Sequence, residues 1–98
     1  MEDNEKIARR FMPTVIKRYR NQAGLSQQQL ADSIGVSKGF ISALEAGRSV
    51  PNLDMLVQLA DALNVPAGTL VNRMVEEAMK SMRQASVQNN TPSEIPFS

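Results

Sequence analysis

The sequence predicts an all-α fold, a compact bundle of five helices around one small hydrophobic core. Two observations predict it. Apolar residues recur at the three- and four-residue intervals of amphipathic helices, and these segments begin at serine or asparagine and end at glycine or asparagine, as capped helices do. No stretch of useful length alternates as a strand would. With 98 residues, 42% of them apolar, the chain has room for one small domain and none for a second, catalytic one.

The residue inventory excludes several classes of function. The chain has no cysteine and no histidine, which removes thiol catalysis, disulfides, histidine acid–base chemistry and the common zinc sites. No glycine-rich phosphate loop and no carboxylate pair at catalytic spacing is apparent, so we expect neither an enzyme nor a cofactor nor a metal site. No apolar run approaches the roughly 20 residues of a membrane span, and the amino terminus is charged where a signal peptide is apolar. We therefore expect a cytoplasmic protein without membrane contact.

The first helix of the domain is expected to follow a short extension. Residues 1–11 form this extension, which has apolar residues on one side and is either a helix or an arm. Pro13 interrupts it, because the residue before a proline avoids the α-helical region. Either the extension is a separate turn of helix, or Pro13 occupies the first position of the next helix, which runs to about residue 23 and ends at Gly24.

The centre of the chain predicts two short helices joined by a glycine turn. Ser26 and Gln29 form a capping box, in which each side chain can bond the other residue's backbone amide. Gly35 ends this first helix with a left-handed residue. Ser37 can cap a second helix that closes at Gly47 in the same way. Two helices separated by about three residues must cross steeply.

Basic residues are concentrated in the first half. Between Lys6 and Arg48 there are eight basic residues against two acidic ones, a net charge of +6, whereas the whole chain has a net charge of only +1. This asymmetry suits a half that meets phosphate, or a helix surface that is merely solvated.

The centre of the chain has a small residue, Ala31, followed after four residues by Gly35 and after six more by the branched Ile41. This pattern resembles the helix-turn-helix of phage Cro and repressor proteins, the xenobiotic-response-element type of regulator. The resemblance covers roughly residues 12–71. Further matching positions are Arg20, Gly24, Leu25, Ser26, Gln27, Ser42, Leu44, Glu45, Gly47, Pro51, Leu53, Leu56, Leu59, Ala60 and Leu63.

The resemblance implies a lambda-repressor-like DNA-binding domain and a sequence-specific regulator of transcription, a repressor more often than an activator. It implies that a homodimer binds an inverted-repeat operator on double-stranded DNA, with the helix over residues 37–46 in the major groove. The protein would then associate with the nucleoid when bound to DNA. It also implies that Arg20 and Glu45 form a structural ion pair.

Helical geometry turns Ile41, Leu44 and Glu45 to the core and leaves an opposite face of small side chains. Lys38 would meet a guanine acceptor or a phosphate, and either Phe40 or Ala43 a thymine methyl. Because this face has few long polar groups, we expect specificity to depend strongly on dimer spacing and DNA shape. The expected base contacts are Lys38, Gly39, Phe40, Ser42 and Ala43. The expected DNA backbone contacts are Gln27, Gln28, Ser37, Lys17, Arg48 and Ser49.

The fourth helix should begin after its cap Asn52 and end at Asn64. Its only charged or amide side chains lie on one strip, so we expect it to be buried on most other sides. A fifth helix should start at Ala67 or Gly68 and run to about Gln84.

A wide apolar stripe on the fifth helix continues past the end of the expected domain, and we expect its part from Met74 to Met82 to be exposed on a monomer and to mark an oligomer interface. Self-association, another protein partner and folding back on the domain all remain open. The runner-up function is accordingly an antitoxin or bridging module that binds a partner through this helix or the tail. The stripe residues are Val71, Met74, Val75, Ala78, Met79 and Met82. The parts of the chain are thus the extension (1–11), the domain (12–72), the oligomerising end of the last helix (73–84) and a polar, disordered tail (85–98).

Overall fold

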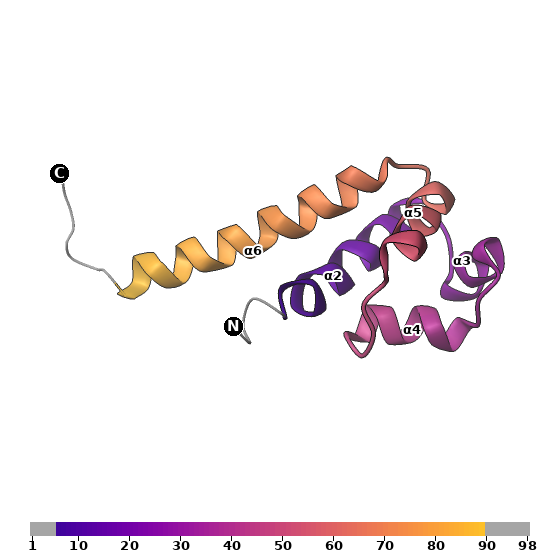
Figure 1. Cartoon of the computed structure of the whole chain (residues 1–98), viewed down its shortest axis with the longest axis horizontal. Helices are drawn as coiled ribbons and strands as arrows, with labels where there is room; N and C mark the ends of the chain where they lie inside the picture. The colour runs from indigo at the N-terminus through magenta and orange to yellow at the C-terminus, as the bar shows by residue number, and fades with distance from the viewer. Residues whose placement is uncertain (1–5, 90–98) are drawn as a thin grey trace.

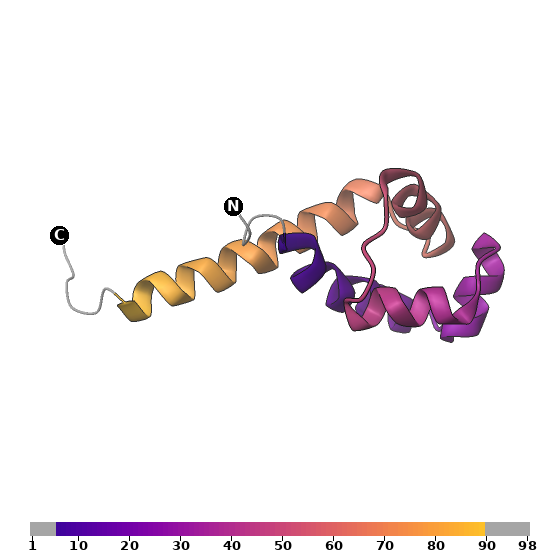
Figure 2. The same cartoon turned by 60° about the horizontal axis from the view of Figure 1, so that its bottom comes forward.

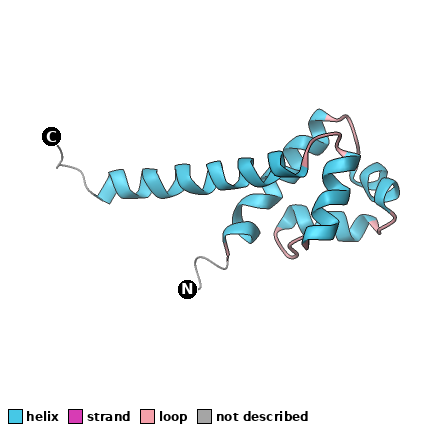
Figure 3. Ribbon diagram, turned by 45° about the horizontal axis from the view of Figure 1, so that its top comes forward, coloured by secondary structure: helices cyan, strands magenta, loops and turns pink. Residues whose placement is uncertain are grey.

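The computed structural model describes residues 6–89, and this part of the chain contains helices and connecting loops but no strand (Figure 3). The all-α prediction is confirmed. The expectations for residues 1–5 and 90–98 lie outside the described part. The helices are α2 (Ile7–Gln22), α3 (Gln27–Ile34), α4 (Lys38–Ala46), α5 (Leu53–Ala62) and α6 (Ala67–Asn89) (Figure 1).

Every helix contributes to one core. Helix α2 packs against both α4 and α6, α3 packs against α4 and α5, and α5 packs against α6. Helix α2 therefore joins the helix-turn-helix to the last helix of the chain. The largest fully buried side chains are Val15, Ile16, Leu30, Ile41, Leu44, Leu59 and Leu70.

Helix α2 runs without a break through Pro13, so both expected alternatives for this proline are wrong. A proline inside a helix removes one backbone hydrogen bond and costs about 3 kcal/mol. Packing compensates here, because Met12 and Val15 on either side of the proline are 4% and 0% exposed. The carbonyl of Arg9, which loses its partner at residue 13, faces Gly47, where a Cβ atom would lie only 3.3 Å from the Arg9 oxygen.

Helix α5 is less buried than expected. Leu56, Leu59 and Ala60 lie in the core, but Leu53 and Val57 are 78% and 57% exposed. The apolar residues extend around more of this helix than its two neighbours, α3 and α6, can cover.

Helix α6 extends past the expected end at Gln84, to Asn89. The stretch between Gly68 and Pro92 contains no glycine or proline that would stop it. Its C-terminal half projects away from the other helices (Figures 1 and 2). Within the described residues, no helix is long and apolar enough to cross a membrane.

The apolar stripe on α6 divides into two faces. Val71 and Met74 are half-buried against the core and Ala78 is 2% exposed, so the expectation that the stripe is exposed from Met74 onward is wrong for Met74 and Ala78. They belong to the face that packs on α2, where Arg73 also donates to the Tyr19 hydroxyl at 3.3 Å. The remaining stripe residues, Val75, Met79 and Met82, are 41%, 50% and 55% exposed.

Candidate nucleic-acid interface

The start of α3 is fixed by the expected capping box. The Ser26 hydroxyl accepts from the Gln29 backbone amide at 3.0 Å, and the Gln29 side-chain oxygen accepts from the Ser26 amide at 2.8 Å. The amides of Gln27 and Gln28 belong to the first turn, where helix geometry supplies no intrahelical acceptor. Together with the helix dipole, these amides form an environment that favours an anion.

Helix α4 is capped at both ends as predicted. The Ser37 hydroxyl accepts from the Phe40 amide at 3.1 Å, and Gly47 ends the helix with φ +80°. Ile41 and Leu44 are buried, and this burial fixes the rotation of α4 about its axis. The opposite side of the helix is therefore the side that faces outward.

The expected base-contacting residues differ in exposure. Lys38 and Gly39, in the first turn, are exposed. Ser42 and Ala43 are half-buried, and Phe40 is half-buried and packs partly against the core. The first turn of α4 is thus the most accessible part of this surface.

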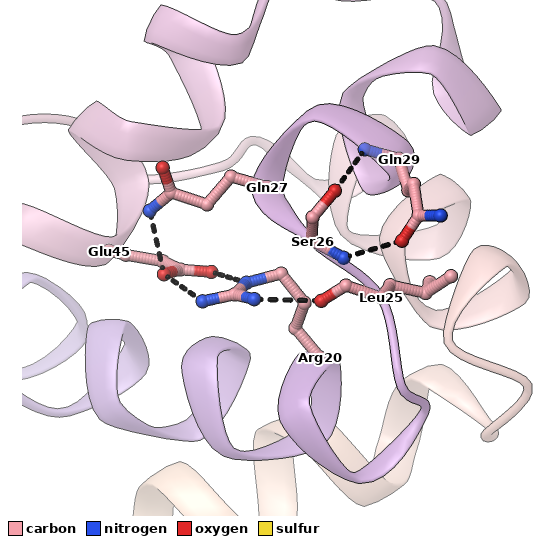
Figure 4. A network of polar contacts seen from close by, with 6 residues as sticks. All are labelled: Arg20, Leu25, Ser26, Gln27, Gln29 and Glu45. Carbon is pink, nitrogen blue, oxygen red and sulfur yellow. Dashed lines mark hydrogen bonds and ion pairs between the residues drawn. The ribbon is translucent and has the colours of Figure 1, made fainter.

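A buried polar network joins α2, α3 and α4 (Figure 4). The Arg20 Nε donates to Glu45 Oε2 at 2.6 Å and its Nη2 to Glu45 Oε1 at 3.0 Å, which confirms the ion pair that the resemblance implies. A third bond runs from Arg20 Nη1 to the Leu25 carbonyl at 2.8 Å. The two side chains of the pair are only 10% and 4% exposed. A bidentate pair of this kind fixes both position and orientation.

The same network holds Gln27. Its Nε2 donates to Glu45 Oε1 at 3.0 Å, a contact that the sequence did not predict (Figure 4). One hydrogen of the amide nitrogen makes this bond, and an amide nitrogen carries two. The carboxylate of Glu45 therefore orients the side chain at the first turn of α3.

Glu45 is held in its charged form. Burial of the carboxyl acts to raise its pKa, but hydrogen bonds from Arg20 and Gln27 and the nearby charge of Lys17 outweigh burial, so its pKa lies below the usual value. The hydrogen bond to Glu45 likewise raises the pKa of Arg20 above its usual value, against the effect of burial.

The other expected backbone contacts lie on α2, on α3, at the N-terminal cap of α4 and in the loop after α4. Exposed Lys17 of α2 lines an open hollow of about 500 Å³ together with Asn21 and Glu45. Gln28 donates to Asp32 at 2.9 Å. Arg48 is exposed and Ser49 half-buried in the loop after α4, where both backbone amides donate to the Ala43 carbonyl. Ser37 is exposed at the α4 cap.

Sequence reasoning missed a contact at the end of α4. The Arg9 Nη1 donates to the Gly47 carbonyl at 3.0 Å, so the residues before Pro13 brace the C-terminal cap of this helix. A cation is favourable at a helix C-terminus, where carbonyls lack partners. No local pattern connects residues 38 positions apart, and from the sequence Arg9 was expected to be either part of an arm along DNA or an ordinary solvated residue.

These features define the chain as a helix-turn-helix protein, and comparison with known proteins agrees. The helix-turn-helix family model matches residues 16–70, more than half of the chain. The chain belongs to this family, and the resemblance to Cro and repressor proteins is confirmed.

The relatives are named as regulators of transcription. The chain is 38% identical over 68 residues to the HTH-type transcriptional regulator SutR of Escherichia coli K12, which covers 69% of this chain and 38% of SutR. It is 34% identical over 62 residues to the HTH-type transcriptional regulator SinR of Bacillus licheniformis, which covers 62% of this chain and 56% of SinR. The chain thus spans little more than a third of SutR and about half of SinR. These names agree with the expectation that the chain is not an enzyme.

Solved structures show the same fold. The clp gene regulator ClgR of Corynebacterium glutamicum superposes with a TM-score of 0.67 at 23% identity, over 71% of this chain and 91% of that chain. A second ClgR structure gives the same TM-score at 21% identity and covers 88% of this chain and 96% of that chain.

Proposed function

We propose that the protein is a sequence-specific, double-stranded DNA-binding regulator of transcription, a repressor rather than an activator. It binds an inverted-repeat operator as a homodimer and places α4 in the major groove. The observation that carries this proposal is the buried Arg20, Glu45 and Gln27 network, because it locks α3 and α4 to α2 at one fixed angle. Helix α4 needs a fixed orientation of this kind if the two copies in a dimer are to bind both half-sites of the operator in register.

Base readout centres on the first turn of α4. Lys38 donates to a guanine acceptor or a phosphate there, and Gly39 lets the helix approach closely. Ser42 makes one hydrogen bond and Ala43 meets a thymine methyl. Phe40 reaches the groove with its outer edge only, because its inner side packs on the core.

Phosphate contacts frame the reading helix. Gln27 binds phosphate through its backbone amide and through the side-chain hydrogen that Glu45 leaves unused. The remaining contacts to the DNA backbone come from Gln28, Ser37, Lys17, Arg48 and Ser49. These positions precede, flank or follow α4, and such contacts set the register of a protein on the duplex.

The dimer forms through α6. Val75, Met79 and Met82 are exposed and lie at four- and three-residue spacing on one face, whereas Val71, Met74 and Ala78 serve the protein's own core. An exposed apolar stripe rich in methionine suits an interface between proteins.

Selection of bound sequences from random DNA by the purified protein tests the proposal, and the expected result is a motif with two-fold symmetry. The Lys38→Ala variant then distinguishes a base contact from a phosphate contact. If Lys38 contacts a base, the variant loses its sequence preference at one base pair. If Lys38 contacts a phosphate, the variant binds all sequences more weakly, and its affinity depends less steeply on salt concentration. Lys80→Ala on α6 is the matched control and is expected to bind like the wild type. If no motif emerges and binding vanishes uniformly with salt, sequence-specific regulation is the wrong function.

A further inference from the structure

The exposed stripe on α6 also carries information about how two copies pair. We propose that two α6 helices pack against each other in antiparallel orientation, with their helix-turn-helix domains at opposite ends. This inference rests on the homodimer of the proposed function and specifies its geometry.

The contact face of α6 is a narrow seam. Val75, Met79 and Met82 are exposed and recur at intervals of four and three residues, the spacing of the core positions of a two-stranded coiled coil. At 100° per residue the three side chains lie within a sector of about 60°. A face this narrow fits one partner helix running alongside.

The two flanks of the seam differ. On one flank Ala78 is buried and Met74 is half-buried, because α2 packs there. The other flank carries Glu76 and Arg83, both exposed, opposite in charge and two helical turns apart. Glu76 makes an ion pair with Arg73 of its own helix at 3.2 Å, but its side chain is 62% exposed and stays accessible to a partner. Of the two flanks, only this one is not covered by α2.

The flanks decide the orientation. In a parallel pair, the charged flank of each helix faces the opposite flank of its partner, which α2 covers and where the α6 residues Met74 and Ala78 are uncharged. In an antiparallel pair, like flanks face each other. Glu76 of each copy then lies near Arg83 of the other, and the two-fold axis makes this ion pair twice.

The antiparallel arrangement also separates the two domains. Met79 of one copy lies opposite Met82 of the other, so the axis passes between these positions. The first residues of the two α6 helices then lie about 40 Å apart, at 1.5 Å per residue. The part of each helix that projects away from the other helices runs along the partner (Figure 2).

Disulfide trapping distinguishes the orientations, because the chain has no cysteine of its own. A mixture of differently tagged Met79→Cys and Met82→Cys proteins is expected to form a mixed disulfide. Val75→Cys alone is expected to stay unlinked, since its two copies lie about 16 Å apart along the axis, beyond the roughly 7 Å reach of a disulfide. A Val75→Cys homodisulfide overturns the antiparallel geometry and leaves the homodimer standing.

Charge reversal gives an independent readout by sedimentation equilibrium. Glu76→Arg and Arg83→Glu are each expected to raise the dimer dissociation constant about three- to ten-fold, and the double variant to restore it. Lys80→Glu, which makes the same charge change as Arg83→Glu but outside the seam, should have no such effect. Failure of the double variant to restore association overturns the antiparallel pairing. If the wild-type protein stays monomeric and the Met79→Cys and Met82→Cys variants form no mixed disulfide, the homodimer of the proposed function is itself overturned.

Discussion

At the scale of single residues, Glu45 matters most for the arrangement of the helices. Its carboxylate accepts three hydrogen bonds, two from Arg20 and one from Gln27, and these bonds tie three helices together. A buried ion pair often stabilises a fold no more than apolar packing does, but removal of one partner strands a charge. The pair therefore serves above all to fix the orientation of α4.

Arg20→Ala is expected to lower the free energy of unfolding by about 3–5 kcal/mol, because Glu45 would be left buried without its counter-charge. Arg18→Ala is the matched control on the same helix. Arg18 meets Glu77 only at 3.9 Å with a side chain 41% exposed, so its loss should cost less than about 1 kcal/mol. Urea denaturation measures both. Equal losses would show that the Arg20 pair is no more than a surface contact.

The lowered pKa of Glu45 predicts a dependence of stability on pH. Because the folded state holds this carboxyl charged, its contribution is full above the pKa of the unfolded chain and is lost as the pH falls through the lower pKa of the folded state. The difference in unfolding free energy between wild type and Glu45→Gln should be constant from about pH 6 to 8 and shrink in acid. A difference that grows as the pH falls would contradict this assignment.

At the scale of elements, α4 is shaped by the two ends of its own sequence and by α2. Ser37 and Gly47 cap it locally. Arg9 and Pro13 of α2 lie against Gly47, so the second cap is also a tertiary contact. The glycine is required there both for its positive φ and for the space that its missing side chain leaves.

Replacement by alanine is expected to have opposite effects on stability at Gly47 and at Gly39. Gly47→Ala should destabilise by at least about 1–2 kcal/mol, from the left-handed backbone and the 3.3 Å approach to the Arg9 carbonyl. Gly39→Ala inside α4 should stabilise by about 0.5–1 kcal/mol, because its nearest neighbour is 3.8 Å away. Thermal unfolding checks both signs. Operator titration should show Gly39→Ala binding more weakly despite its higher stability, and unchanged binding would remove Gly39 from the DNA contact.

The sequence predicted those elements whose signals are local. The caps at Ser26, Ser37 and Asn52 stand within three residues of the amides that they bind, and all three form. The Arg20–Glu45 pair spans 25 residues and was predicted only through the family resemblance.

The features that the sequence did not predict all depend on tertiary packing. The local rule for Pro13 is correct for an isolated chain, but burial of Met12 and Val15 overrides it. Nothing near Leu53 in the sequence says that α5 lacks a third neighbour. The stripe on α6 was predicted correctly as apolar, but its division between α2 and solvent depends on the position of α2.

At the scale of the whole molecule, one helix, α6, joins the packed domain to the exposed stripe that we propose as the dimer interface. The described chain measures 53 Å along its longest axis against 25 and 20 Å along the others. Helix α6 has 23 residues and is about 35 Å long at 1.5 Å per residue, so it supplies most of that length. No loop separates its packed part from its projecting part.

Met79→Glu is expected to abolish dimerisation, because it places two like charges in an apolar seam, and to weaken binding to a full operator far more than to a single half-site. Val57→Glu is the matched control: this valine is also exposed and apolar, but it lies on α5. Analytical ultracentrifugation and operator titration measure the two effects. If both variants dimerise like the wild type, α6 is not the interface.

The division of α6 also bears on how this domain can be cut and recombined. The residues that pack on α2 reach as far as Ala78, and the exposed seam already begins at Val75, so the two sets overlap within a single turn of helix. A chimera that keeps the domain intact must therefore retain the beginning of the seam. A chimera that removes the whole seam also removes α6 residues that pack on α2, and so exposes the core. The proposed dimer interface therefore cannot be separated from the core of the domain.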